Sequence, residues 1–218
     1  MKRSRLKDWR WWLGLAPKHL KFPPPSGDIT ILVPAFNEAK SIGLTILSLL
    51  RQTRTPDRII VIDDCSTDGT GDIARQFGVE VLRTPKNSGT KAQAINLALP
   101  LVRTEYVCVV DGDTLLKRDA LEKILPAFHD DRVVAACGYV IPQKIRTFWE
   151  RARFIEYIFS LSIYKRAQNH LGVVFVCSGC FSVFRTRALT QTEGFDPVSY
   201  THLLKKGCAS STVIFKIS

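Results

Sequence analysis

The sequence lacks any apolar run of the roughly 18 residues that a membrane-spanning helix needs, and its N-terminus lacks the apolar core of a signal peptide. The chain as given is therefore predicted to be neither secreted nor transmembrane. Six cysteines in 218 residues are too few for a disulfide scaffold. Cys65, Cys108 and Cys137 lie in or beside apolar runs and are predicted to be buried free thiols in a reducing compartment. Cys177 and Cys180 have the spacing of metal ligands, but no second pair or neighbouring histidine completes a zinc site.

Length and charge indicate one domain preceded by a basic arm. A chain of 218 residues can bury roughly 70% of its unfolded surface, which is enough for one substantial domain. The formal net charge is +11, and much of it lies in residues 1–27, which also hold Trp9, Trp11 and Trp12 before a proline-rich linker. Basic residues with tryptophan are typical of a membrane interface, and a solvated tail is the alternative. We therefore expect a membrane surface as one partner of the chain.

Apolar stretches and helical patterns alternate along the chain after this arm. Strands are predicted at residues 29–33 (stopped by Pro34), 58–62, 79–82, 106–110 and 133–140. Helices are predicted from about residue 41, through 73–77, at 91–99 and from about 119 with a late kink at Pro126. The first helix would carry Ile42, Ile46, Leu49 and Leu50 on one face. This alternation predicts an α/β fold in which ligands bind at the carboxyl ends of the strands.

The strand at 106–110 ends in two carboxylates that flank a glycine. Its β-branched and aromatic residues do not alternate with polar ones, which indicates a strand that is buried on both faces. If the strand direction continues, Asp111 and Asp113 point to the same side, and Gly112 permits close approach of another group. Two such close carboxylates favour a divalent cation shared with substrate phosphates. An ordinary acidic turn is the alternative explanation.

Polar and acidic residues also follow the two earlier strands. Asn37 and Glu38 come after the first strand, and Asp63 and Asp64 come after the second. Together with the two later aspartates they would form an acidic rim that repels phosphates, and a bridging cation with Lys91 would resolve this conflict. Each turn alone can also be explained by capping, and the predicted caps are Ser66, Asp68 and Thr70. Three such turns in register favour one shared ligand.

Two later segments are rich in apolar side chains. Residues 146–159 are basic, aromatic and amphipathic, which suits the bilayer interface or a missing partner segment, with a core helix as the alternative. Residues 171–184 are interrupted by glycine and serine and are predicted to form strand, turn and strand.

Basic charge with aromatic residues also raises nucleic-acid binding as an alternative. The sequence contains no recognised binding motif, and the acidic rim would repel a phosphate backbone, so we expect no nucleic-acid partner.

These motifs, in this order, resemble the family 2 glycosyltransferases, and within them the processive synthases of cellulose, chitin, hyaluronan and poly-N-acetylglucosamine. The matching residues are Val33-Pro34-Ala35-Phe36-Asn37-Glu38, Asp63 to Thr70, Asn87 to Ala92, Asp111-Gly112-Asp113, and Ser178 to Phe181 with Phe184 and Arg185. Each motif is weak alone, whereas five in order at this spacing form a specific pattern. The resemblance implies the GT-A fold, a Rossmann-like nucleotide-diphospho-sugar transferase fold with a mixed central sheet.

The resemblance also implies a metal-dependent enzyme that moves a sugar, with inversion, from a UDP-sugar donor to a growing polysaccharide or lipid-linked acceptor. The donor nucleotide would contact Pro34, Ala35, Asn37, Glu38, Asp63, Asp64, Lys91, Asp111 and Gly112. Within this set Glu38 would approach the ribose, Asp64 the uracil and Lys91 the diphosphate. Asp111 and Asp113 would hold Mg²⁺ or Mn²⁺, with Asp113 as the direct ligand. The acceptor side would include Ser178, Gly179 and Cys180.

The sequence departs from this family after residue 197. The family's Thr-Glu-Asp base motif is expected soon after Gly194-Phe195-Asp196-Pro197, and neither it nor a Gln-x-x-Arg-Trp motif is present. We therefore assign no catalytic base and expect a truncated enzyme: residues 28–197 as an incomplete GT-A domain and residues 198–218 as an atypical, non-native tail. Such a chain would bind donor with little or no transfer. The alternatives are a noncatalytic nucleotide-sugar-binding fragment and a nonprocessive lipid-phosphate glycosyltransferase. The expected location is the cytoplasmic face of the cell membrane.

Overall fold

The computed structural model describes residues 28–131, 133–138, 147–159, 179–192, 194–196 and 214–217. The strands are β1 (Ile29–Ala35), β2 (Arg58–Asp63), β3 (Glu80–Arg83), β4 (Tyr106–Val110), β5 (Val133–Cys137), β6 (Phe181–Arg185) and β7 (Ile214–Ile217). The helices are α1 (Ile42–Leu50), α2 (Thr70–Gln76), α3 (Lys91–Ala98), α4 (Ala120–Ile124), α5 (Phe148–Phe159) and α7 (Thr186–Gln191). Short 3₁₀ turns follow α3 at Leu99–Leu101 and α4 at Leu125–His129.

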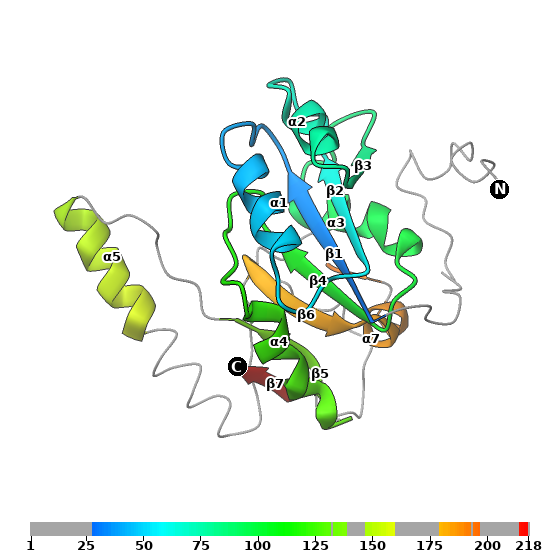
Figure 1. Cartoon of the computed structure of the whole chain (residues 1–218), viewed down its shortest axis with the longest axis vertical. Coiled ribbons are helices and arrows are strands. Elements are labelled where there is room, and N and C mark those ends of the chain that lie inside the picture. The colour runs from blue at the N-terminus through cyan, green and yellow to red at the C-terminus, as the bar shows by residue number, and fades with distance from the viewer. Residues whose placement is uncertain are drawn as a thin grey trace.

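Among the described residues, seven strands form one mixed sheet in the order β3-β2-β1-β4-β6-β5-β7 (Figure 1). The four strands β3, β2, β1 and β4 are parallel, whereas β6 runs antiparallel to both β4 and β5. The parallel strands therefore direct the loops after β1, β2 and β4 to one edge of the sheet. The predicted α/β class with a mixed sheet is confirmed.

Two apolar cores lie on opposite faces of the sheet. Residues from α1, α2 and α4 build one core, and residues from α3 and α7 build the other. The strand β4 contributes Cys108 and Val110 to the first core and Val107 and Val109 to the second. All four side chains are fully buried, which confirms that this strand is covered on both sides.

Three local predictions need correction. Pro34 does not stop β1, which continues to Ala35. The pairing of β1 with β4 ends at Leu32, so Pro34 lies beyond the last residue of β1 that pairs with β4. A proline, which has no N–H to donate, is tolerated there. Leu50 is 46% exposed, and Thr45 takes its place on the buried face of α1, because that face follows positions 42, 45, 46 and 49. The strand β3 spans Glu80–Arg83, one residue later than predicted, so it includes Arg83.

The predicted kink near Pro126 appears as a change of helix type. The α-helix α4 ends at Ile124, and a 3₁₀ turn with Pro126 near its start continues to His129. Proline lacks the N–H that an α-helix would use at this position, so the tighter turn follows from the sequence. Phe128 in this turn is buried against the ring of Tyr106, with the ring centroids 4.9 Å apart.

The predicted amphipathic segment forms α5, which stands away from the sheet (Figure 1). Its exposed large side chains include Phe148 and Trp149, at 77% and 78%. Within the described part of the chain, no helix has both the length and the apolar character to cross a membrane. The strand β7 lies in the stretch predicted to be an atypical tail and pairs with β5. The basic arm, Ser178 and Pro197 lie outside the described residues.

The cysteines in the described ranges are free thiols, as predicted. Cys108 and Cys137 are buried, and burial raises the pKa of the Cys108 thiol. Cys65 is only partly buried, which corrects the expectation of a core position. It lies in the loop after β2, where its backbone has a positive φ of 63°. Few non-glycine residues adopt this conformation.

Candidate functional site

Hydrogen bonds join the loops after β1 and β2: backbone N–H groups of the first loop donate to side-chain oxygens of the second. The backbone N–H of Asn37 donates to Ser66 Oγ at 3.0 Å, and that of Glu38 donates to Thr70 Oγ1 at 2.8 Å. The N–H of Ala39 donates to Asp68 Oδ2 at 2.9 Å. The predicted capping residues of the second loop therefore cap the first loop, and the two loops form one unit.

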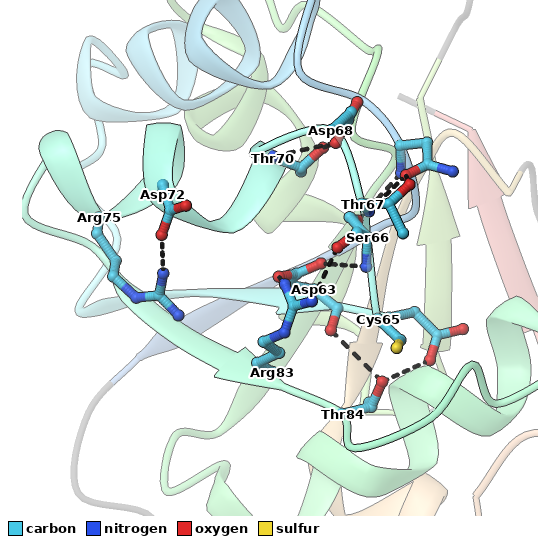
Figure 2. A network of polar contacts seen from close by, with 12 residues as sticks. Asp63, Cys65, Ser66, Thr67, Asp68, Thr70, Asp72, Arg75, Arg83 and Thr84 are labelled. Carbon is cyan, nitrogen blue, oxygen red and sulfur yellow. Dashed lines mark hydrogen bonds and ion pairs between the residues drawn. The ribbon is translucent and has the colours of Figure 1, made fainter.

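Two non-glycine residues in these loops have left-handed backbones. Asn37 has a φ of 56°, and its side-chain Oδ1 accepts a hydrogen bond from Thr67 N at 2.9 Å. Cys65 has a φ of 63°. Such conformations are uncommon outside glycine and persist where surrounding contacts enforce them. Figure 2 shows the network that surrounds Cys65.

Asp63, the last residue of β2, and Asp64, which follows it, are buried and hold neighbouring loops. Asp63 is fully buried, and its carboxylate accepts from Arg83 Nη1 at 2.5 Å and from Ser66 N at 2.9 Å. Asp64 is 7% exposed, and its carboxylate accepts from Thr84 Oγ1 at 2.9 Å and from both the N–H and the hydroxyl of Ser88. Both aspartates thus shape the site, and their contact with a nucleotide stays a prediction.

Lys91 connects three parts of the site. It is the first residue of α3, and its ammonium group forms an ion pair with Asp111 and donates to the carbonyl of Gly179 at 2.6 Å. The N–H of Asp111 in turn lies 3.4 Å from the carbonyl of Cys180. The structure therefore brings together residues that were predicted for the diphosphate, the metal and the acceptor side. Ser178, the remaining acceptor-side residue, lies outside the described residues.

Gly112 lies against the end of β1. A Cβ atom at this position would be 3.2 Å from Ala35 Cβ and 3.3 Å from Glu38 Cγ. The Gly112 carbonyl accepts a hydrogen bond from the buried Thr45 Oγ1 at 2.9 Å. The absence of a side chain thus permits the close approach that the sequence predicted. Pro34, the residue before Ala35, continues the register of β1 with β2 opposite Ile62.

Asp113 differs from the other acids of this edge. Its side chain is exposed, and it has no hydrogen-bond or ion-pair partner among the residues that the structure describes. Across those same residues, no group of three or more histidine, cysteine or acidic side chains is placed to hold a metal ion. Within the part of the chain that the structure describes, Asp111 and Asp113 can therefore offer carboxylate oxygens to a cation, but they have no third acidic, histidine or cysteine ligand beside them.

The acidic rim predicted from the sequence is partly neutralised. Arg83 pairs with Asp63, and Lys91 pairs with Asp111. The hydroxyl of Thr70, followed by the N–H of Ala39, stabilises the charged form of Asp68 and lowers its pKa. Two rim carboxylates, Asp63 and Asp111, thus have ion-pair partners, whereas Asp113 has none among the described residues.

Sequence reasoning missed Arg83, Thr84 and Thr45. Each acts through a contact with a residue at least 20 positions away: Arg83 contacts Asp63, Thr84 contacts Asp64, and Thr45 contacts Gly112. The available signal for Arg83 was the parallel pairing of β2 with β3, which sets it opposite Asp63. A one-residue error in the predicted end of β3 hid that pairing.

The fold and this edge define a class: an α/β domain whose loops at the carboxyl ends of parallel strands form a polar site of the kind that binds nucleotides. Residues 30–192 match the sequence profile described as Glycosyl transferase family 2. The chain belongs to this glycosyltransferase family. The family match confirms the predicted resemblance and favours glycosyl transfer over the nucleic-acid alternative.

Curated relatives include the poly-beta-1,6-N-acetyl-D-glucosamine synthase of Staphylococcus aureus (strain COL). It is 27% identical over 173 residues, which cover 77% of this chain and 42% of the synthase. The chain thus spans less than half the length of this relative.

Solved structures with the same fold include the mannosyltransferase PcManGT from Pyrobaculum calidifontis in complex with GDP-Man and Mn²⁺. Its TM-score is 0.67 at 23% identity, over 89% of this chain and 55% of that one. Glucosyl-3-phosphoglycerate synthase from Mycobacterium tuberculosis, in complex with Mn²⁺, UDP-glucose and phosphoglyceric acid, gives 0.54 at 19% identity, over 76% and 59%. These likenesses confirm the predicted GT-A fold.

Proposed function

We propose that this chain carries the donor-binding domain of a metal-dependent glycosyltransferase. The enzyme would move a sugar from a UDP-sugar to a polysaccharide or lipid-linked acceptor, with inversion at the anomeric carbon. The observation that carries the proposal is the position of Lys91, which contacts both Asp111 and the Gly179 carbonyl beside the exposed Asp113. A cation, a metal-binding pair and an acceptor-side turn are what transfer from a diphosphate requires in one place.

The residues of this edge fit a divalent cation that is shared with a diphosphate. Asp113 and Asp111 would hold Mg²⁺ or Mn²⁺, which typically takes one or two carboxylates plus substrate phosphates as ligands. When bound, the ion would neutralise negative charge on the departing diphosphate. The relatives support this assignment, because PcManGT and glucosyl-3-phosphoglycerate synthase were both solved with Mn²⁺.

The chain's own residues would bind and orient the donor. Lys91 would face the diphosphate and stabilise the charge of the leaving group. Glu38 lies against Gly112, on the β1 side of the site, and would approach the ribose. Asp64 would set the position of the base through the loop at 84–88 that it holds. We assign no residue as the general base.

A calorimetric titration of UDP into the purified chain, with and without Mn²⁺, tests the proposal. We expect metal-dependent binding of UDP, weaker binding of GDP, and loss of binding in Asp113→Ala. Asp72→Ala is the matched control, because Asp72 is an exposed aspartate on α2 whose partner is Arg75. A folded sample that binds neither nucleotide, or an Asp113→Ala variant that binds as well as the wild type, would contradict it.

We also propose that the parent enzyme works at the cytoplasmic face of the cell membrane. Two exposed apolar surfaces support this location: α5, and a hollow lined by α1 and residues 115–118. In the hollow, Leu44 and Leu115 are 60% and 41% exposed and lie beside Arg51 and Arg118. Leucine with arginine suits an anionic bilayer surface. Sedimentation with vesicles that contain anionic lipid should retain the chain, and equal retention by neutral vesicles would contradict the charge argument.

A further inference from the structure

Arg83, the last residue of β3, contacts both ends of the turn formed by residues 63–66. It stands opposite Asp63 in the parallel register of β2 and β3. Its Nη1 donates to Asp63 Oδ2 at 2.5 Å, and its Nη2 donates to the carbonyl of Ser66 at 2.8 Å (Figure 2). One guanidinium group therefore spans the turn from residue 63 to residue 66.

The carboxylate that Arg83 holds is enclosed. Asp63 has no exposed surface, and its other oxygen accepts the N–H of Ser66 at 2.9 Å. Gly71 packs directly on it, since a Cβ atom there would lie 2.4 Å from Asp63 Oδ2. A buried carboxylate without a charged partner is strongly unfavourable, so the position of Asp63 depends on Arg83.

The span held by Arg83 has a constrained backbone. It contains Cys65 in the left-handed region, a conformation that a non-glycine residue keeps only where its surroundings enforce it. Ser66, at the far end of the span, accepts the N–H of Asn37 through its hydroxyl. Arg83 thus restrains the loop after β2 directly and the loop after β1 through Ser66.

We propose that Arg83 is a positioning residue for donor binding: it fixes residues 63–66 in the conformation that receives the nucleotide. The proposal rests on the proposed function, because it concerns the same site. Arg83 acts through Asp63 and the Ser66 carbonyl. Its planar group can hold both acceptors at once, whereas a lysine offers a single point charge.

A second arginine provides a matched control on the same two strands. Arg58, at the start of β2, forms a two-point contact with the carboxylate of Glu80 at the start of β3. Its Nη1 also donates to the carbonyl of Leu101. Arg58 and Arg83 thus make the same kind of bridge at opposite ends of one strand pair, and only Arg83 lies at the candidate site.

The test compares Arg83→Met, Arg83→Lys and Arg58→Met by UDP titration with Mn²⁺ and by thermal unfolding. We expect Arg83→Met to weaken UDP binding about tenfold or more and Arg83→Lys to restore part of the affinity. Arg58→Met should lower the melting temperature but leave the affinity within about twofold. Equal affinities for Arg83→Met and wild type, or a loss in Arg58→Met as large as in Arg83→Met, would overturn the proposal.

Hydrogen exchange separates this proposal from the proposed function, because it needs no ligand. The Ser66 amide should exchange faster in Arg83→Met than in the wild type, with no change in Arg58→Met. If Ser66 behaves as expected while wild-type UDP binding is absent, the proposed function fails and the loop restraint stands. Unchanged exchange at Ser66 overturns the restraint. If Arg83→Met does not fold, Asp63→Asn/Arg83→Met removes the unpaired buried charge and takes its place in both assays.

Discussion

The amino and carboxyl edges of the four parallel strands both carry charged residues, but these residues have different roles at the two edges. At the amino edge, Arg58 pairs with Glu80, and Arg185 is buried among the carbonyls of Phe128 and Val133 with Glu105 beside it. At the carboxyl edge, Arg83 and Lys91 pair with two aspartates, while Asp113 has no partner in the described part of the chain. At the amino edge these arginines are held by contacts within the protein, whereas at the carboxyl edge the Asp113 carboxylate is available for a ligand.

Arg185 shows how this difference bears on motif residues. It belongs to the motif that carries the family resemblance, yet the structure sets it opposite Tyr106 at the amino edge, at the far end of β4 from Asp111. It is 4% exposed, and its guanidinium group lies over the rings of Tyr106 and Phe128 at 5.6 and 5.5 Å. We infer that Arg185 stabilises the fold, whereas the residues of the opposite edge are those proposed to bind the donor.

The largest expected effect is on the unfolding free energy, when Arg185 at the amino edge is replaced. Arg185→Met would leave the buried carbonyls of Phe128 and Val133 without their donor, at a cost of about 3 kcal/mol in unfolding free energy. UDP affinity of the folded protein should stay within about twofold, because the substitution is remote from Asp111 and Lys91. Urea unfolding and calorimetry measure the two quantities. A variant that keeps its stability but loses UDP binding would reverse the roles of the two edges.

A smaller effect, on UDP affinity, is expected when Lys91 at the carboxyl edge is replaced. Lys91→Met removes the cation that faces the diphosphate and should weaken UDP binding about tenfold, or about 1.4 kcal/mol. Stability should change by less than about 1 kcal/mol, because the pair with Asp111 is partly exposed. Lys123→Met is the control, since Lys123 forms a more exposed lysine–aspartate pair with Asp119 outside the site. Equal UDP affinity in both variants would exclude the assigned role of Lys91.

The smallest effect concerns the link between the two loops. Hydrogen bonds from Thr70 and Ala39 lower the pKa of Asp68, so the charged form stabilises the folded state above the unfolded-state pKa. This contribution is lost as the pH falls through the lower pKa of the folded state. The melting temperature of the wild type should therefore exceed that of Asp68→Asn near neutral pH, and the gap should close below about pH 4. A gap that stays constant down to about pH 2 would contradict this link.

The sequence predicted those parts of the fold and site that depend on local patterns. The unbroken apolar run at 106–110 identified β4, and the polar residues after three strands identified the edge that the structure assembles. Pairing across the chain was not visible in the same way. The buried side of α1 was misjudged at Leu50, and Arg83 was overlooked because its importance depends on the register of β3 with β2. Residues that act through distant partners need the sheet before their role can be inferred.

Paramagnetic broadening by Mn²⁺ is the most direct test of the central claim that the carboxyl edge is the ligand-binding edge. In a labelled sample with UDP, substoichiometric Mn²⁺ should broaden the amide signals of Glu38, Gly112 and Asp113 first, because the effect falls steeply with distance from the ion. The amides of Arg58, Glu105 and Arg185 at the amino edge should remain sharp, and Mg²⁺ serves as the diamagnetic control. Broadening that begins at the amino edge, or that affects both edges equally, would contradict the account.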